Sequence, residues 1–152
     1  MKKLVFSSVE ETMRFGARLG RLIKKGDCIA LTGQLGAGKT TLVKGIAKGM
    51  GVKDPQHVNS PSFVILKEHK GKMPLYHFDV YRLNDPEEMD TVGYKDFFYG
   101  DGASVVEWAD KIREILPEEY LNIELSVAGE EKREANISAR GKRYERLLRR
   151  LA

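Results

Sequence analysis

The sequence predicts a three-layer α/β domain built on a mostly parallel sheet. Short apolar runs of strand length alternate along the chain with segments whose apolar residues recur at helical spacing. Near the carboxyl end, two segments of alternating apolar and polar residues predict an antiparallel hairpin, so we expect the sheet to be mixed at one edge. A length of 152 residues suits one core, and we expect residues 1–152 to form a single domain.

The amino-terminal elements are set by local signals. Ser8 and Glu11 have the spacing of a capping box, in which each side chain satisfies a free amide at a helix start. The apolar run from Cys28 to Leu31 suits a buried parallel strand. A glycine-rich segment comes next and opens a second helix, and Gly51 ends that helix. The elements expected here are a strand at 3–6, a helix from 9 to about 23, a strand at 28–31 and a helix from 39 to about 50.

The second half is expected to alternate strands with short helices. Pro61 breaks the entry to one strand, and Pro86 suits the first turn of a helix. The tail repeats apolar residues at intervals of three and four from Tyr144 to Leu151, which indicates an amphipathic helix. The expected elements are a loop and strand over 58–66, strands at 75–80 and 103–106, short helices from 86 and over 110–116, a hairpin of 121–127 with 135–139, and the helix at 144–151.

Composition excludes several classes of protein. The net charge of +4 comes from the tail, because residues 140–152 hold six basic residues and one acid, and the remaining 139 residues sum to −1. A broad surface for nucleic-acid phosphates is therefore not indicated. Cys28 is the single cysteine and is expected in a strand core, so no disulfide is predicted. The amino-terminal apolar run, Leu4 to Phe6, is too short for a signal peptide and no stretch could span a bilayer, so we expect a cytoplasmic protein.

A glycine-rich loop carries the chemistry. It reads Gly33-Gln34-Leu35-Gly36-Ala37-Gly38-Lys39-Thr40 and matches the Walker A pattern, G-x4-G-K-S/T. Glycines let successive backbone amides turn inward as an anion nest, and the helix that begins at Lys39 adds its own free amides. Lys39 is expected to reach nucleotide phosphates and Thr40 to ligate Mg²⁺. A chance match in a chain of this length occurs roughly once in a hundred or less.

Two acidic residues follow predicted strands. Asp79 ends the run 75–78, and Glu107 ends the run 104–106. A nucleotide-hydrolysing loop of this kind needs an acid at a neighbouring strand end to hold Mg²⁺ or to orient water, so we expect both to face the metal. The guanine-reading sequence N-K-x-D is absent, which favours ATP. The predicted fold is then a P-loop NTPase-like sheet with a carboxyl-terminal antiparallel hairpin and a terminal amphipathic helix.

Four segments, kept in order between residues 5 and 140, resemble the TsaE family. They are Gly33-Gln34-Leu35-Gly36-Ala37-Gly38-Lys39-Thr40-Thr41, Ser60-Pro61-Ser62-Phe63, the run His77-Phe78-Asp79-Val80-Tyr81-Arg82-Leu83 with Asp85-Pro86-Glu87-Glu88, and Glu107-Trp108. Gln34 stands where that family usually has aspartate, which exchanges a charge near the phosphates.

The resemblance implies an ATPase required for threonylcarbamoyl transfer to the adenosine beside the anticodon of certain tRNAs, with TsaD and TsaB as partners. ATP and Mg²⁺ are the implied cofactors, and the loop from Gly33 to Thr41 would bind the nucleotide. Lys39, Asp79 and Glu107 would be catalytic, with Thr40 and the two acids at the metal. Residues 60–63 would be a switch loop that senses the γ-phosphate. Trp108 would lie near the nucleotide and Thr12, with Glu11, near the adenine.

Other residues have two interpretations each. Arg82 could supply charge to a transition state or pair with an acid such as Asp85 or Glu87. His77 could ligate a metal or be structural. The tail arginines and Lys142 could contact tRNA phosphates or a partner's acidic face, or form the solvated side of a helix.

Two other functions stay open beside a partner-activated ATPase: a small-molecule kinase, and a nucleotide-dependent binding switch without turnover.

Overall fold

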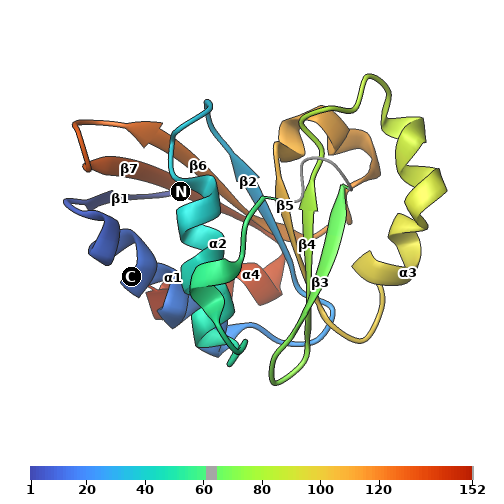
Figure 1. Cartoon of the computed structure of the whole chain (residues 1–152), viewed down its shortest axis with the longest axis horizontal. Helices are drawn as coiled ribbons and strands as arrows, with labels where there is room; N and C mark the ends of the chain where they lie inside the picture. Colours follow the sequence, from blue (N-terminus) through green and yellow to red (C-terminus); the bar gives the residue numbers. More distant parts are fainter. Residues whose placement is uncertain (61–64, 152) are drawn as a thin grey trace.

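The structure, a computed structural model, describes residues 1–60 and 65–151 and has a seven-stranded sheet at its centre (Figure 1). The order across the sheet is β1-β7-β6-β2-β5-β4-β3. The strands are β1 (Lys2–Phe6), β2 (Cys28–Thr32), β3 (Leu66–Lys70), β4 (Pro74–Asp79), β5 (Ala103–Glu107), β6 (Tyr120–Val127) and β7 (Arg133–Arg140). The central strands β6, β2, β5 and β4 are parallel, and β7 pairs antiparallel with both β6 and β1. The predicted mostly parallel sheet with its antiparallel hairpin is confirmed.

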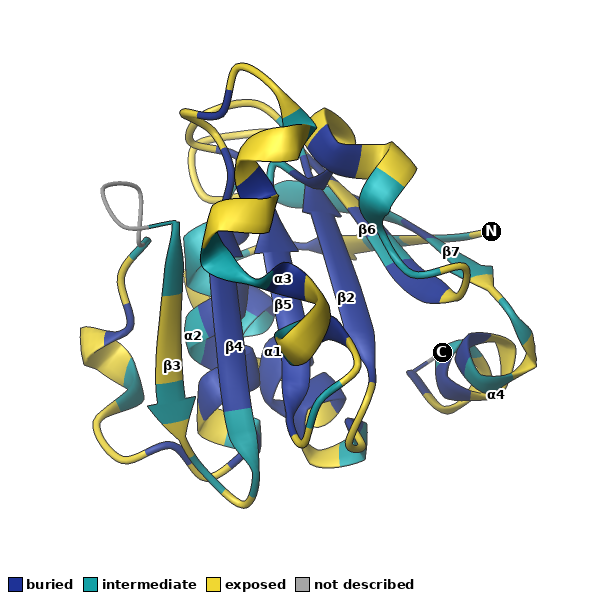
Figure 2. Ribbon diagram, turned by 90° about the vertical axis from the view of Figure 1, so that its right-hand side faces the viewer, coloured by how far each residue is buried: buried dark blue, intermediate teal, exposed yellow. Residues whose placement is uncertain are grey.

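Helices cover both faces of the sheet, so the three layers are also confirmed (Figure 2). The helices α1 (Val9–Leu22), α2 (Lys39–Gly49) and α4 (Lys142–Leu151) pack on one face, and the short elements η2 (Pro86–Val92), α3 (Tyr94–Phe98) and η3 (Ala109–Ile115) on the other; η1 is Pro55–His57. Successive side chains of β2 point to opposite faces of the sheet. Ile29 packs in the hydrophobic core on the side of α1, α2 and α4, and Ala30 packs in the core on the side of η2, α3 and η3. Because β2 is buried on both sides, its run of apolar residues was readable as a parallel strand.

A loop and then a strand were expected over 58–66, and the strand that the structure describes lies further along the chain. The strand β3 begins only at Leu66, and three residues join it to β4 as a hairpin, so β3 is antiparallel. The sheet is therefore mixed at both edges and not at one. As an edge strand, β3 is polar and largely exposed, and it lacks the apolar pattern by which the other strands were found. Of the expected switch loop, residues 61–64 lie outside the described part of the chain.

The short helices on the second face differ from the expectation in detail. The segments predicted from Pro86 and over 110–116 form the 3₁₀ helices η2 and η3, and α3 was not predicted at all. A helix of five residues is too short to show a helical period, although Tyr94 and Phe98 are buried.

Helices α1 and α2 pack with their backbones in contact. A Cβ atom on Gly49 would lie 2.1 Å from the carbonyl oxygen of Ala17, and one on Gly20 would lie 2.2 Å from that of Ile46. Glycine at these positions therefore permits the close approach. Since α2 starts at Lys39, this contact fixes the direction from which α2 meets the sheet.

Within the described part of the chain, none of the helices combines the length and the apolar character that a membrane crossing needs.

Candidate functional site

The glycine-rich loop, residues 33–38, joins the end of β2 to the start of α2. Gly36 and Gly38 have φ angles of +82° and +100°, which L side chains rarely adopt. Gly38 is the N-cap of α2, and no side chain caps the first amides of that helix. These amides and the positive end of the helix therefore form a place where an anion is stabilised.

Lys39 lies folded over this loop. Its Nζ atom donates hydrogen bonds to the carbonyl oxygens of Gly33, at 2.5 Å, and Gln34, at 2.9 Å. The same atom lies 4.0 Å from the centroid of the Trp108 ring. Burial lowers the pKa of Lys39, and the carboxylates of Glu107, Asp79 and Asp110 oppose that shift. An ammonium group removed from water in this way interacts strongly with an incoming anion.

Glu107 is the centre of a buried hydrogen-bond chain. It ends β5 and lies in register with Leu31 of β2 on one side and with Asp79 of β4 on the other. The Thr40 hydroxyl donates to its carboxylate, 3.0 Å from Oε1, while Nε2 of His77 lies 2.6 Å from Oε2. His77 is wholly buried and Glu107 is 2% exposed. These hydrogen bonds hold the Glu107 carboxylate in one orientation, next to the Thr40 hydroxyl.

Asp79 connects β4 to the segment before β3. Its Oδ1 accepts a hydrogen bond from the Tyr81 amide at 2.9 Å, and its Oδ2 accepts one from the Ser60 hydroxyl. Ser60 is the last described residue before the gap at 61–64. A movement of Ser60 would therefore change a contact of the Asp79 carboxylate.

Trp108 closes the site on the side of η3. Its φ of 63° places a bulky residue in the left-handed region, a conformation that costs on the order of 1–3 kcal/mol and is enriched at functional sites. Its ring packs against Tyr81, with centroids 4.7 Å apart, as well as over Lys39. The strained backbone thus aims the indole at the lysine.

These groups line one cavity of about 280 Å³. Its walls contain nine of the residues predicted from the sequence, together with Ser60 and Arg133: Leu35, Gly36, Gly38, Lys39, Thr40, Thr41, Asp79, Glu107 and Trp108. Gly33 and Gln34 line the adjoining hollow on the other side of Trp108, and Ala37 is buried in the core. Thr12 is buried in α1 with its hydroxyl 3.4 Å from the Ser8 carbonyl and does not line the cavity.

Arg133 is the residue that the sequence analysis missed. It falls between the two strands of the expected hairpin, 121–127 and 135–139, and in the structure it is the first residue of β7. Its Nη2 donates to the carbonyl of Gly36, 97 positions away, at 3.3 Å. No local spacing signals such a contact. Of the other residues weighed, Arg82 is exposed and does not line the cavity.

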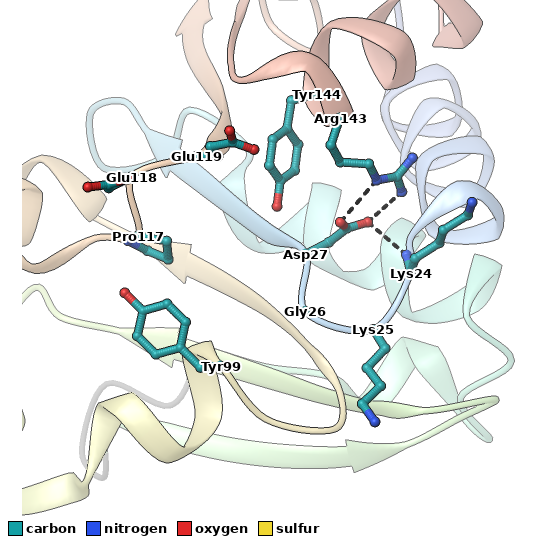
Figure 3. Close-up of a pocket in the computed structure, with 10 residues that line it drawn as sticks. All are labelled: Lys24, Lys25, Gly26, Asp27, Tyr99, Pro117, Glu118, Glu119, Arg143 and Tyr144. Atoms are coloured by element: carbon teal, nitrogen blue, oxygen red, sulfur yellow. Dashed lines mark hydrogen bonds and ion pairs between the residues drawn. The ribbon is translucent and has the colours of Figure 1, made fainter.

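A second and larger hollow, of about 650 Å³, lies at the opposite end of β2 (Figure 3). Asp27 precedes β2, and its carboxylate accepts hydrogen bonds from the Arg143 guanidinium, at 2.6 and 3.1 Å, and from the Lys24 amide, at 2.7 Å. The Tyr144 hydroxyl accepts a hydrogen bond from the Cys28 amide. Burial raises the pKa of Cys28 to about 12, with Asp27 adding to the shift. The buried polar groups here are paired with one another and tie α4 to the sheet.

Comparisons with known proteins agree on a family. A family model described as Threonylcarbamoyl adenosine biosynthesis protein TsaE matches residues 6–135. The tRNA threonylcarbamoyladenosine biosynthesis protein TsaE of Bacillus subtilis is 44% identical over 100% of this chain and 96% of its own length. The protein of the same name from Treponema pallidum is 38% identical over 90% of this chain and 99% of its own length. A crystal structure of Bacillus subtilis YdiB superposes with a TM-score of 0.81 at 39% identity, covering 99% of this chain and 93% of that one.

Proposed function

This chain belongs to the TsaE family of tRNA threonylcarbamoyladenosine biosynthesis, and from that premise we propose that it binds ATP with Mg²⁺ and hydrolyses the nucleotide. One observation carries the proposal. Lys39 and Thr40, at the start of α2, share a single cavity with the carboxylates of Asp79 and Glu107. Strand pairing of β4 with β5 brings the two carboxylates to the same edge of the sheet.

The residues present fit the proposed cofactors. The loop offers helix-start amides and a buried ammonium group to phosphate. The hydroxyl of Thr40 and the carboxylates of Glu107 and Asp79 are hard oxygen donors, which Mg²⁺ prefers. Among the described residues no group of three or more histidine, cysteine or acidic side chains could hold a metal by itself. That suits Mg²⁺, because it is usually held by one or two carboxylates together with substrate phosphates.

In the proposed reaction, water attacks the terminal phosphorus, the bond to the bridging oxygen breaks, and ADP and phosphate are released. Bound Mg²⁺ would neutralise charge on the phosphate oxygens. Lys39 and the amides of the glycine-rich loop would hold the phosphates in line. Thr40, Glu107 and Asp79 would hold the metal and orient the attacking water, whose proton passes to a carboxylate. His77 keeps the Glu107 carboxylate in place from behind.

We place this hydrolysis in threonylcarbamoyl transfer to the adenosine beside the tRNA anticodon, with TsaD and TsaB as partners. The hydrogen bond from Ser60 to Asp79 supports a switch, since it links the site to the chain segment that precedes β3. Nucleotide-dependent ordering of that segment would favour docking on TsaD–TsaB, and hydrolysis would release or reset the complex. Docking that is indifferent to the bound nucleotide would rule the switch out.

Phosphate release from ATP tests the proposal, measured with the protein alone and with TsaB and TsaD added. We expect slow release alone and strong release with partners, because partner-completed sites of this class hydrolyse slowly by themselves. The variant Lys39→Ala should abolish both. Tight ATP binding without stimulation by the partners would contradict the ATPase proposal and favour a binding switch. Label transfer from ATP to a small-molecule acceptor would favour a kinase.

A further inference from the structure

We propose that Arg133 is a phosphate-binding residue of this site, reaching the nucleotide from the β6–β7 hairpin. The inference rests on the proposed ATP-binding function and adds a residue to it. Arg133 lines the same cavity as Lys39 and Glu107, although it comes from a different element and lies far away in the sequence. Its Nε atom lies 3.7 Å from where a Cβ of Gly38 would stand, next to the helix start that favours an anion.

The guanidinium group is fixed in place by the hairpin turn. Its Nη1 atom donates to three backbone carbonyls of that turn, those of Lys132 at 2.9 Å, Gly129 at 3.1 Å and Glu130 at 3.3 Å. Its Nη2 atom donates to Gly36 at 3.3 Å. A guanidinium that is held before the ligand arrives loses less conformational entropy on binding it.

The fixed group has hydrogen-bonding capacity left for a ligand. Arginine carries five N–H donors, and the contacts above engage Nη1 and one donor of Nη2. The Nε–H and the second Nη2–H have no acceptor among the described residues. Within the same part of the chain Arg133 is in no ion pair either, whereas Arg143 is paired with Asp27. Both free N–H groups lie in the plane of the guanidinium, the group that suits recognition of a phosphate.

The charge balance of the cavity also calls for a second cation. Its ionisable walls are Lys39 and Arg133 on one side and Asp79 and Glu107 on the other. Without Arg133 the ionisable walls would carry a net charge of −1, and of the described cations that line the cavity only Lys39 would join the bound Mg²⁺ in offsetting a polyphosphate. With it, the protein charges of the cavity cancel, and the anion meets a site that does not repel it.

Calorimetric titration of the full chain with ATP and Mg²⁺ tests the inference in four variants. We expect Arg133→Ala to weaken ATP binding about 10- to 100-fold, the usual effect of removing a charge-assisted contact. Arg133→Lys should recover part of the loss, because it keeps the charge. Arg140→Ala is the matched control: Arg140 ends the same strand and lies over the Tyr120 ring, outside the cavity, so ATP binding should not change.

Each contrary outcome is distinct. Unchanged ATP affinity in Arg133→Ala would overturn the inference. Equal losses in the alanine and lysine variants, together with a lower melting temperature, would overturn it too, since lysine cannot bridge three carbonyls and the arginine would then only order the turn. Lys39→Ala, titrated alongside, separates the two proposals. Binding that needs Lys39 but not Arg133 defeats only this inference, and absence of ATP binding by the unaltered protein defeats the proposed function with it.

Discussion

Both ends of β2 carry buried charged side chains, but among the described residues an arginine–carboxylate ion pair forms at only one of them. At the amino-terminal end, Asp27 is buried against the Arg143 guanidinium, and the Tyr144 hydroxyl accepts from the amide that begins the strand. Three hydrogen bonds satisfy the Asp27 carboxylate, two from the Arg143 guanidinium and one from the Lys24 amide. This end is a tie between α4 and the sheet.

At the carboxyl-terminal end, the described residues hold the buried Lys39 ammonium and Glu107 carboxylate by hydrogen bonds, and neither is in a lysine- or arginine-to-carboxylate ion pair. The Lys39 ammonium donates to two backbone carbonyls and faces no carboxylate within ion-pair distance among the described residues. Glu107 is held by a hydroxyl and a histidine, and the Nδ1 of that histidine has no hydrogen-bond partner in the described chain. Burial of charge therefore does not by itself distinguish function from structure here. The kind of pairing does, because a charge held only by hydrogen bonds, and not by a lysine- or arginine-to-carboxylate ion pair, remains available to a ligand.

Neutralising Glu107 gives the largest expected effect. The variant Glu107→Gln keeps the shape of the side chain but removes the charge that serves metal and water, so we expect partner-stimulated phosphate release to fall at least about 100-fold. The free energy of unfolding should fall by about 1 to 2 kcal/mol, less than for a buried arginine–carboxylate pair, since the hydrogen bonds to Thr40 and His77 are weakened but no lysine or arginine of the described chain loses its partner. Phosphate release and urea unfolding measured on the same preparation check both. A variant that hydrolyses ATP normally would remove Glu107 from the chemistry.

Neutralising Asp27 should give the reverse result. The variant Asp27→Asn leaves Arg143 without its partner, and we expect a loss of about 3 kcal/mol in the free energy of unfolding. That figure is at the low end for buried pairs because the Arg143 side chain is 25% exposed. ATP binding at 25 °C should not change, since Asp27 does not line the nucleotide cavity.

Asp101→Asn is the matched control for this loss. Asp101 pairs with Lys25 at 3.0 Å, but both side chains are mostly exposed, so we expect less than about 1 kcal/mol. Equal destabilisation by Asp27→Asn and Asp101→Asn in urea would mean that the buried tie stabilises no more than a surface contact.

The sequence predicted one end of β2 better than the other. Asp79 and Glu107 could be placed together because each follows an apolar run, and parallel strands end at a common edge. Arg143 was expected, with the other tail arginines, to contact tRNA phosphates or a partner's acidic face, or to lie on the solvated side of a helix. Its pairing with Asp27 was not expected, because the bond spans 116 positions and leaves no local pattern. Arg133 was missed for the same reason. The glycine-rich motif and the amino-terminal strands and helices could be predicted because their signals lie in short stretches of sequence. The groups that complete each end of β2, Arg133 and Arg143, come from the last 20 residues and are placed only by tertiary packing.

The smallest expected effect concerns Cys28, at the amino-terminal end of β2, where Asp27 is paired with Arg143. Burial holds its pKa at about 12, whereas an unfolded thiol ionises near 8.5 to 9. The folded protein keeps this proton when the unfolded chain has lost it, so the contribution of Cys28 to stability is complete below about pH 8 and declines above pH 9. By pH 10 the loss should reach about 1.4 kcal/mol.

The serine variant isolates that decline, because serine does not ionise in this range. We expect the difference in unfolding free energy between the unaltered protein and Cys28→Ser, measured in urea, to be constant from pH 6 to 8 and then to shift against the cysteine form as pH rises to 10. Burial raises the pKa of Tyr144 as well, and that contribution cancels in the difference since both proteins carry the tyrosine. A difference that stays flat to pH 10 would mean that solvent reaches the thiol, and that the amino-terminal end of β2 is open in the way that only the nucleotide end is expected to be.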